Sequence, residues 1–406
     1  MKNIAILGFG TVGAGVADVI AASCNKICRE IHDVINIKYI LDLRDFPESK
    51  YADRVIHDFD IILNDPEVEI ICETMGGTKV AFDYTLKALN AGKSVVTSNK
   101  EVVAAYGKLL CDVAREKGVR YLYEASVGGG IPILRTMKTS LAANEIYGID
   151  GILNGTTNYI LTHMRDDGTS FAEALAQAQQ KGYAEANPKA DVDGDDACRK
   201  ICILAALAFG AMIPQSLVNC EGISNVTLDT IEKAKKFGGD IKLIASARRM
   251  TGEKIDISVS PCVVSSDNPL SGVSDVFNAI MIHAQHLGDV MMYGKGAGKL
   301  PTASAVLSDI IEIAKSGKNT VQETWNIGDP SMLSDNDTVS DNFCVFVAHS
   351  FGASSAKVLT LFGKAQEVFS DSEGFGVIIE NVSRNKIRKT LHTAGIKEYS
   401  VFRYIK

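Results

Sequence analysis

The chain has 406 residues, of which 22% are charged, and its formal net charge is −7. A chain of this length is expected to form two or three domains. The negative charge argues against broad binding of nucleic acid or of anionic membrane surfaces. No apolar run reaches the roughly 20 residues of a membrane helix. Lys2-Asn3 in front of an apolar run is not typical of a signal peptide, so we expect a cytoplasmic protein.

The nine cysteines are an odd number scattered through apolar segments, which favours reduced, buried thiols. Two pairs have helical i, i+4 spacing, Cys24/Cys28 and Cys198/Cys202. Neither has a neighbouring Cys or His pair that would complete a tetrahedral zinc site. We interpret both pairs as packing residues.

The first predicted elements are a strand, a tight turn and a helix. The apolar run Ile4–Leu7 leads into Gly8-Phe9-Gly10-Thr11-Val12-Gly13, and a helical pattern follows. In this context G-x-G-x-x-G is typical of a dinucleotide site: the glycines allow a tight turn, a close pyrophosphate, and close packing of helix on strand. The N-terminus of the helix favours phosphate. A strand-to-helix turn without a ligand is the alternative interpretation.

Strands and helices then alternate to about Val127, which predicts a parallel sheet with helices on both faces. The further strands expected are 35–41, 70–72, 94–97 and 120–123, and the helices are 82–89 and 102–117. Asp42 and Arg44 follow the second strand. An acid there would hold a ribose 2′-hydroxyl, and an arginine would accept a 2′-phosphate. The residues therefore leave NAD and NADP both open.

The pattern changes at Gly128-Gly129-Gly130-Ile131-Pro132, a cluster of helix and strand breakers. Beyond it we expect a strand at 149–153, helices at 171–181 and 197–209, and two strands of a separate sheet, Ile255–Val259 and Pro261–Val264. A second Gly-rich turn, residues 293–302 with Gly298, precedes a helix at 303–314. This turn suggests that the chain returns to the cofactor site.

The polar segment 317–341 is predicted to be a linker. After it, residues 342–406 show the order β-α-β-β-α-β, which predicts a small ferredoxin-like module. The fold class expected is thus α/β, with a Rossmann domain at 1–127, a return segment at about 293–316, an α+β domain at 128–292 and the C-terminal module.

Five acids lie between Glu185 and Asp196, in front of an apolar helix. Acids at a helix N-terminus are favourable in themselves, so a surface cap is one interpretation. Asp196 and Lys200 are spaced i, i+4 and share one helix face, where the lysine would orient a polar substrate. The order of acids in an EF-hand is not met.

Two other polar segments are candidates for the chemistry. Lys100 follows a predicted strand end, where a lysine beside a cofactor's positive ring can act as acid or base; an exposed lysine is the alternative. Gly155-Thr156-Thr157 offers N–H groups and hydroxyls for a carboxylate, and it also suits an ordinary N-cap.

Several motifs in order make the chain resemble the homoserine dehydrogenase family over nearly its full length. They are Gly8–Gly13, Ser98-Asn99-Lys100, Tyr123–Gly128, Leu153–Asn158, Gly182–Glu185, Asp191–Asp196 with Lys200, Glu221-Gly222-Ile223, Gly294–Gly298 and Pro301–Ser304. The resemblance implies reversible reduction of aspartate 4-semialdehyde to homoserine with NAD(P)H, on the route to threonine and methionine.

The resemblance also implies roles for individual residues. Glu185 and Asp191 would hold the substrate, with Glu185 on its ammonium group, and Gly155 and Thr156 would lie near it. Asp196 and Lys200 would be close to the reacting centre, with Lys100 as first choice and Lys200 as second choice for the acid. The cofactor would contact the Gly8–Gly13 turn, Arg44, Ser98, Lys100 and Gly298. A monovalent cation, sodium or potassium, would be held at Glu124, Val127, Gly129 and Ile131.

The C-terminal module resembles an ACT domain, a regulatory module of the family. Where an effector loop would often read Asp-x-Pro-Gly, this chain has His349-Ser350-Phe351-Gly352-Ala353. The module could therefore bind an amino-acid effector or serve in assembly, and the sequence leaves both functions open. The resemblance implies a homodimer, with a homotetramer as alternative, formed through the middle-domain sheet.

Two other functions are weighed against this one. Another Rossmann amino-acid dehydrogenase, such as aspartate-semialdehyde dehydrogenase, needs a nucleophilic cysteine in an electropositive site, and no cysteine here has such sequence surroundings. A non-catalytic nucleotide-binding sensor would keep the glycines but would not need Lys100, Asp196 and Lys200 together. The sequence favours the enzyme.

Overall fold

The computed structural model describes residues 1–316, 322–349 and 353–406. Contacts divide the chain into two compact units, each built from separate stretches. The first contains Met1–Ala143, Cys202–Gln215 and Gly294–Gly328, and the second contains Asn144–Ile201, Ser216–Tyr293 and Asp329–Lys406. Among the helices within these described ranges, none combines the length and hydropathy that a membrane span requires.

The first unit is built on a six-stranded sheet with the order β3-β2-β1-β4-β5-β6, in which every pair of neighbours is parallel. Its strands are β1 (Lys2–Leu7), β2 (Ile35–Leu41), β3 (Val55–Ile56), β4 (Val68–Glu73), β5 (Ser94–Thr97) and β6 (Tyr121–Leu122). The strand order reverses between β1 and β4, and ligands of such sheets bind at this point. The Rossmann fold predicted for the N-terminal part is confirmed.

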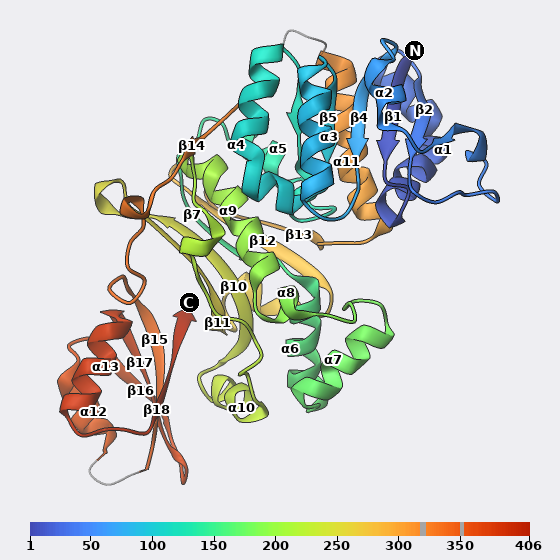
Figure 1. Ribbon diagram of the computed structural model, residues 1–406. Helices are drawn as coiled ribbons and strands as arrows, with labels where there is room; N and C mark the ends of the chain where they lie inside the picture. Colours follow the sequence, from blue (N-terminus) through green and yellow to red (C-terminus); the bar gives the residue numbers. More distant parts are fainter. Residues whose placement is uncertain (317–321, 350–352) are drawn as a thin grey trace. The chain divides into compact units, whose positions relative to one another are not determined.

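Helices cover both faces of this sheet (Figure 1). They are α1 (Thr11–Ile31), α3 (Lys79–Asn90), α4 (Lys100–Lys117) and α11 (Lys299–Ser316). The same unit contains the short helices α2 (Phe59–Asn64), which packs on α3, and α5 (Ile133–Lys138). Ile4 and Ile6 of β1 share one apolar cluster with α1 and α11. A Cβ on Gly15 of α1 would lie 2.9 Å from the carbonyl oxygen of Lys299. The late helix α11 therefore packs tightly on the first helix of the chain.

Part of the predicted linker is packed into the first unit. Trp325 is buried, and its ring meets that of Tyr123 edge to face at 5.7 Å. It is followed by β14 (Asn326–Ile327), which pairs in parallel with β8 (Ala211–Met212). Residues 317–321 of the same predicted linker lie outside the described residues.

The second unit is built on a mixed sheet with the order β13-β12-β7-β10-β11-β18-β15-β17-β16, and β9 is also paired with β11. Its first strands are β7 (Ile146–Ile152), β9 (Asn219–Cys220), β10 (Gly239–Arg249), β11 (Ile255–Ser265), β12 (Phe277–Ala284) and β13 (Gly288–Lys295). Its helices before the C-terminal module are α6 (Gly155–Asp167), α7 (Phe171–Gln180), α8 (Lys189–Val192), α10 (Leu228–Lys236) and the start of α9 (Asp195–Phe209). Of these strands, β9, β10, β12 and β13 have no counterpart among those expected from the sequence.

The prediction of two strands on either side of Ser260 is wrong, because β11 runs unbroken through Pro261. Proline lacks an N–H group and interrupts pairing where a neighbouring strand needs that donor. On the side of β11 opposite β10, β9 pairs with Ser258 and Val259, and β18 begins to pair at Cys262. Pro261 falls between these two stretches, so the strand tolerates it.

The C-terminal module has the predicted order, β15 (Ser340–Ala348), α12 (Ser355–Leu361), β16 (Ala365–Ser370), β17 (Gly374–Ser383), α13 (Arg384–Thr393) and β18 (Tyr399–Ile405). Its strands lie in the order β18-β15-β17-β16 with antiparallel neighbours, and its two helices share an apolar cluster with β15 and β17. The strand β18 also pairs in parallel with β11. The module's sheet is therefore continuous with the sheet that carries β7.

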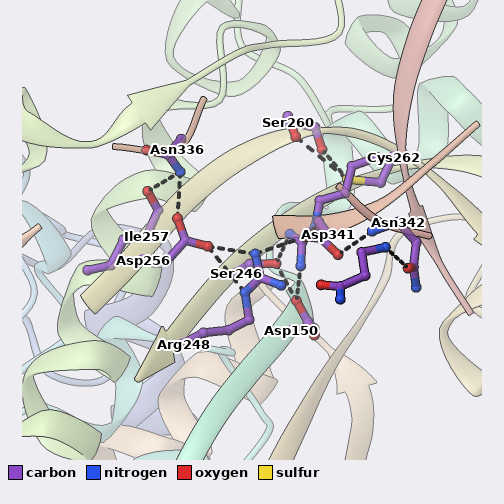
Figure 2. A network of polar contacts seen from close by, with 12 residues as sticks. Asp150, Ser246, Arg248, Asp256, Ile257, Ser260, Cys262, Asn336, Asp341 and Asn342 are labelled. Carbon is purple, nitrogen blue, oxygen red and sulfur yellow. Dashed lines mark hydrogen bonds and ion pairs between the residues drawn. The ribbon is translucent and has the colours of Figure 1, made fainter. Parts of the chain in front are cut away.

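Charged side chains cross the joint between β11 and this module (Figure 2). Arg248 of β10 contacts Asp256 at 2.6 Å and Asp341 of β15 at 2.9 Å. Asp256 also accepts a hydrogen bond from Asn336 at 2.8 Å. Arg403 of β18 donates to Asp341 at 2.5 Å and to Ser246 of β10 at 2.6 Å. Both backbone pairing and ion pairs thus hold the module to the rest of the unit.

Candidate active site

The turn between β1 and α1 can be formed only by glycine at two of its positions. Gly8 has φ +88°, and a Cβ there would press on the backbone of Thr74 and Met75. A Cβ on Gly13 would lie 2.0 Å from the carbonyl oxygen of Gly8. A Cβ on Gly10 would meet nothing within 4 Å, so its lack of a side chain is not explained by packing. Open space at Gly10 is what a closely approaching pyrophosphate requires.

The predicted cofactor residues from Gly8 to Gly13 form this turn and the start of α1. Gly10 caps the helix without a side-chain acceptor, and the first turn, which includes Thr11 and Val12, has no acid. The N–H groups there are available to a phosphate. Thr74, which follows β4, donates to the Gly8 carbonyl oxygen at 2.8 Å. The turn and the β4 loop are therefore joined at the point where the strand order reverses.

Asp42, at the end of β2, is held by four hydrogen bonds. One oxygen accepts from the Arg44 N–H and Nε, both at 3.0 Å, and the other accepts from the Phe9 N–H at 2.8 Å and Arg44 Nη2 at 3.1 Å. The Arg44 guanidinium lowers the pKa of the Asp42 carboxyl to about 2. A carboxylate has about four acceptor sites, so those of Asp42 are filled. The Arg44 side chain itself is 64% exposed.

A buried carboxyl that the sequence did not point to lies beneath the loops after β4 and β5. Glu73 accepts hydrogen bonds from the Met75 N–H at 2.7 Å and the Thr97 hydroxyl at 2.5 Å. It is fully buried, and burial raises its pKa to about 7. Asn99 donates to the Gly77 carbonyl oxygen at 2.7 Å. Together these bonds connect the two loops at the edge of the sheet where a cofactor is expected.

Ser98 and Lys100 lie on the second of these loops. The Ser98 N–H donates to the Glu73 carbonyl oxygen at 3.3 Å. Asn99 caps α4 by accepting from the Val102 N–H at 3.2 Å, and Lys100 is the first residue of that helix and partly buried. The two residues proposed for cofactor and proton transfer are thus at the carboxyl end of β5, as expected.

The second Gly-rich turn belongs to the same unit. Gly298 has φ +125° and precedes α11, and its carbonyl oxygen accepts from the Thr302 N–H at 3.1 Å. The N-terminus of α11 lies beside α1, because Lys299 contacts Gly15 and pairs with Asp18 at 2.7 Å. The return of the chain to this unit agrees with the expectation from the sequence.

The predicted cation residues form one loop, but the Glu124 carboxylate has another role. Its two oxygens accept from the N–H groups of Leu134 and Arg135, at 3.0 and 2.7 Å, and so cap α5. Burial raises the pKa of Glu124 and that of the neighbouring Asp309, which reaches about 7. A cation at this loop would therefore depend on backbone carbonyl oxygens, such as those of Val127 and Gly129. In the described part of the chain no group of His, Cys, Asp and Glu has metal-site geometry.

In the second unit, three of the predicted residues meet around Asn154. Asn154 follows β7, and its Nδ2 donates to Asp191 at 2.7 Å and to Asp196 at 2.9 Å. The Lys200 ammonium donates to Asp196 at 2.7 Å and to the Leu153 carbonyl oxygen at 2.7 Å. Asn154, Asp196 and Lys200 are all buried. Of the five acids, Asp196 is thus part of a packed polar site and not a solvated helix cap, and Asp191 is joined to that site through Asn154.

The remaining substrate candidates lie on either side of this cluster. A Cβ on Gly155 would be 2.7 Å from the Val276 carbonyl oxygen, so packing requires glycine there. The Thr156 hydroxyl donates to the Tyr183 carbonyl oxygen at 2.7 Å and ties α6 to the segment before α8. Glu185 is exposed in that segment. No hydrogen bond or ion pair described for the chain joins the Glu185 carboxylate to the Asn154 cluster.

The glycine of the Glu221-Gly222-Ile223 motif supports the same cluster from outside. A Cβ on Gly222 would be 2.0 Å from the Val192 carbonyl oxygen, which also accepts from the Ile223 N–H at 2.8 Å. Val192 follows Asp191 directly in α8. The close approach of these two segments therefore places Asp191.

Comparison with known proteins gives a consistent result. A family model for "Homoserine dehydrogenase, NAD binding domain" matches residues 8–124, and one for "Homoserine dehydrogenase" matches residues 132–311. The chain is 37% identical over 397 residues to the homoserine dehydrogenase of Bacillus subtilis, which covers 95% of this chain and 88% of that protein.

Solved structures agree with these matches. The crystal structure of a homoserine dehydrogenase from Thiobacillus denitrificans has a TM-score of 0.87 and 29% identity, covering 99% of this chain and 98% of that one. A hyperthermophilic archaeal homoserine dehydrogenase in complex with NADPH has a TM-score of 0.67 and 29% identity, covering 80% and 100%. On this evidence the chain belongs to the homoserine dehydrogenase family.

Proposed function

We propose that this chain catalyses the family reaction, the reversible NAD(P)-dependent reduction of L-aspartate 4-semialdehyde to L-homoserine, and that each of its two units binds one of the reactants. The first unit binds the cofactor, which supplies the hydride when bound. The second unit binds the amino-acid substrate. The observation that carries this proposal is the polar cluster of Asp191, Asp196 and Lys200 around Asn154, in which all but the partly buried Asp191 are buried. An amino-acid aldehyde presents both an ammonium group and an oxygen that becomes negative, and this cluster offers partners for both.

The substrate ammonium is assigned to Asp191 and Glu185, and the substrate carboxylate to Gly155 and Thr156 at the N-terminus of α6. Asp191 is partly buried and joined to the cluster through Asn154, whereas the role of Glu185 rests on the family resemblance. The N-terminus of a helix favours a carboxylate. As the hydride reaches the aldehyde carbon, the carbonyl oxygen gains negative charge and needs a proton.

Lys100 is the first choice for the acid and Lys200 the second. The Lys200 ammonium contacts two acceptors, Asp196 and the Leu153 carbonyl oxygen, so it is oriented and suited to stabilise the developing alkoxide. For Lys100→Ala we expect turnover to fall by about 10²- to 10⁴-fold while cofactor binding survives. Lys108→Ala on the same helix is the control, and near-normal turnover of Lys100→Ala would contradict this role.

We further propose that NADP(H) is preferred. The four acceptor sites of Asp42 are filled, so it has no site for the ribose hydroxyls of NAD, whereas the exposed Arg44 guanidinium suits a 2′-phosphate. The archaeal relative's complex with NADPH agrees with this preference.

A monovalent cation is proposed at the backbone carbonyl oxygens of Glu124, Val127, Gly129 and Ile131. The loop is held from both sides: Asp309 accepts from the Glu124 N–H at 2.8 Å, and Gly129 packs against Gly296. Replacing sodium and potassium by choline should lower activity. Activity that is independent of the cation would contradict the proposal.

We also propose that the enzyme is a cytoplasmic homodimer or homotetramer, and that the C-terminal module serves assembly or binds an amino-acid effector. Its joining strand β18 supports a structural role. Light scattering gives the subunit number, and kinetics with added threonine test the effector.

The deciding experiment follows absorbance at the reduced-nicotinamide band with purified protein, L-homoserine, and NADP⁺ or NAD⁺ in parallel. Reduction of a cofactor that depends on homoserine is expected, and it should be faster with NADP⁺. A folded protein that reduces neither cofactor at alkaline pH, with sodium or potassium present, would favour the non-catalytic sensor.

A further inference from the structure

Asn154 has no assigned part in the reaction, yet its side chain makes three hydrogen bonds, two of them to carboxylates of the acid cluster. Its Oδ1 accepts from the Thr157 N–H at 2.8 Å and caps α6. Its Nδ2 donates to Asp191 and to Asp196. Because a cap must present oxygen to the helix, the orientation of the amide is fixed, and the nitrogen faces the two carboxylates.

Capping alone does not explain why this residue is asparagine. Asn, Asp and Ser are about equally good N-caps. Of these three, an Asp carboxylate supplies no donor, and a Ser hydroxyl supplies one. Only Asn can accept from Thr157 and also donate two hydrogen bonds. The need to donate two hydrogen bonds, in addition to the cap, therefore explains why this residue is asparagine.

The two hydrogen bonds that Asn154 donates bring two carboxylates, those of Asp191 and Asp196, close together. Asp191 lies in the short helix α8 and Asp196 in the first turn of α9, so their backbones belong to different elements. Two carboxylates that share one donor lie close to each other and repel. Asn154 donates to both carboxylates, and the Lys200 ammonium donates at 2.7 Å to the same Asp196 oxygen, Oδ2, that accepts from Asn154.

We propose that Asn154 is a positioning residue of the reaction, which sets Asp191 and Asp196, and through Asp196 also Lys200, in the geometry that receives the substrate. This inference rests on the proposed roles of those three residues. It predicts that loss of the two donated hydrogen bonds lowers kcat/KM for homoserine, while the helix cap, the fold and cofactor binding are retained.

The test compares Asn154→Ser and Asn154→Asp with wild type in the full-length enzyme. Both variants keep an oxygen for the cap. We expect kcat/KM for homoserine to fall by about 10- to 100-fold in Asn154→Ser, the range for lost bonds to charged groups. Asn154→Asp, which adds a third carboxylate, should lose more. The dissociation constant of NADP⁺ should stay within about twofold of wild type.

Ser170→Ala is the matched control, because Ser170 caps α7 in the same unit with a hydrogen bond of the same kind. It should lower the melting temperature without changing kcat/KM. If Asn154→Asp stays within about twofold of wild type, Asn154 only caps the helix and the proposal is overturned. If wild type itself turns over no homoserine, the proposed function fails, and the positioning role fails with it.

Discussion

Arg403 of β18 and Cys262 of β11 are paired neighbours in one sheet, although Arg403 lies near the end of the chain. Their pairing makes the last strand of the C-terminal module part of the sheet that also contains β7. The Arg403 guanidinium then reaches Asp341 at 2.5 Å and lies 3.7 Å from Asp150 of β7. The C-terminal module is thus built into the second unit.

Arg403→Ala should therefore destabilise the whole second unit. The substitution removes the buried Arg403 guanidinium from Asp341, Ser246 and Asp150, and it leaves Arg248 as the remaining guanidinium partner of Asp341. Removing one partner of a buried ion pair costs about 3–5 kcal/mol. Urea denaturation measures the change in the free energy of unfolding. Arg388→Ala removes an exposed pair with Asp337 and should cost less than about 1 kcal/mol. Equal effects of the two substitutions would contradict the structural role of Arg403.

Gly10 and Gly13 should respond differently to alanine. Gly13→Ala places a Cβ 2.0 Å from the Gly8 carbonyl oxygen, and overpacking of this kind should cost about 3 kcal/mol or more. Gly10→Ala meets no protein atom, so the melting temperature should change by less than about 2 °C, while KM for the cofactor should rise roughly tenfold because the methyl group obstructs the pyrophosphate. Unchanged cofactor kinetics in Gly10→Ala would place the phosphates elsewhere.

Arg44→Ala should change the choice between cofactors. We expect kcat/KM for NADP⁺ to fall by about 10- to 100-fold, because a hydrogen-bonded charge partner of the 2′-phosphate is lost. The value for NAD⁺ should stay the same or rise, since Asp42 regains free acceptor sites. Steady-state kinetics with both cofactors measure the ratio, and Arg29→Ala at the end of α1 is the control. A parallel loss with both cofactors would show that Arg44 does not contact the 2′-phosphate.

Glu73 should make stability fall with rising pH. Its pKa is raised from 4.5 to about 7 by burial, so between these values the folded protein holds a proton that the unfolded chain has lost. The contribution is complete below pH 4.5 and is lost as the pH rises through about 7. The loss is on the order of 3 kcal/mol.

Glu73→Gln is neutral and should lack this pH dependence. Unfolding experiments at several pH values should therefore show wild type losing stability relative to the variant from about pH 5 to about pH 8. Glu116→Gln, at an exposed site of α4, should show no such trend. A constant difference between wild type and Glu73→Gln would mean that Glu73 is ionised throughout.

Elements with a strong local pattern were predictable. The strand β5 has the predicted bounds, Ser94–Thr97, because an apolar run lies between turn residues. The strand β13 alternates between exposed and partly buried residues at the sheet edge and gave no clear signal. At Pro261 a sound local rule gave the wrong answer, because pairing on one side of β11 changes from β9 to β18 at that residue.

In the candidate site, too, some residues were predictable from the sequence and others were revealed only by the structure. Lys100, Asp196 and Lys200 were predicted as site residues from residue type, spacing and resemblance, whereas Glu73 and the donor role of Asn154 were not predicted. Asn154 lies next to a helix start and has the sequence pattern of a cap. Its partners Asp191 and Asp196 are 37 and 42 residues away along the chain, and no local pattern links them.

The sequence by itself determined the Gly-rich turn, the alternation of strands and helices, and the family, since these depend on backbone freedom and periodicity over a few neighbouring residues. Only the tertiary structure decided that Asp42 is saturated by Arg44 and Phe9, that one amide joins two carboxylates, and that the last strand completes the sheet beside β11. Packing chooses these partners, because a buried polar group must find its hydrogen bonds among whatever segments the fold brings to it.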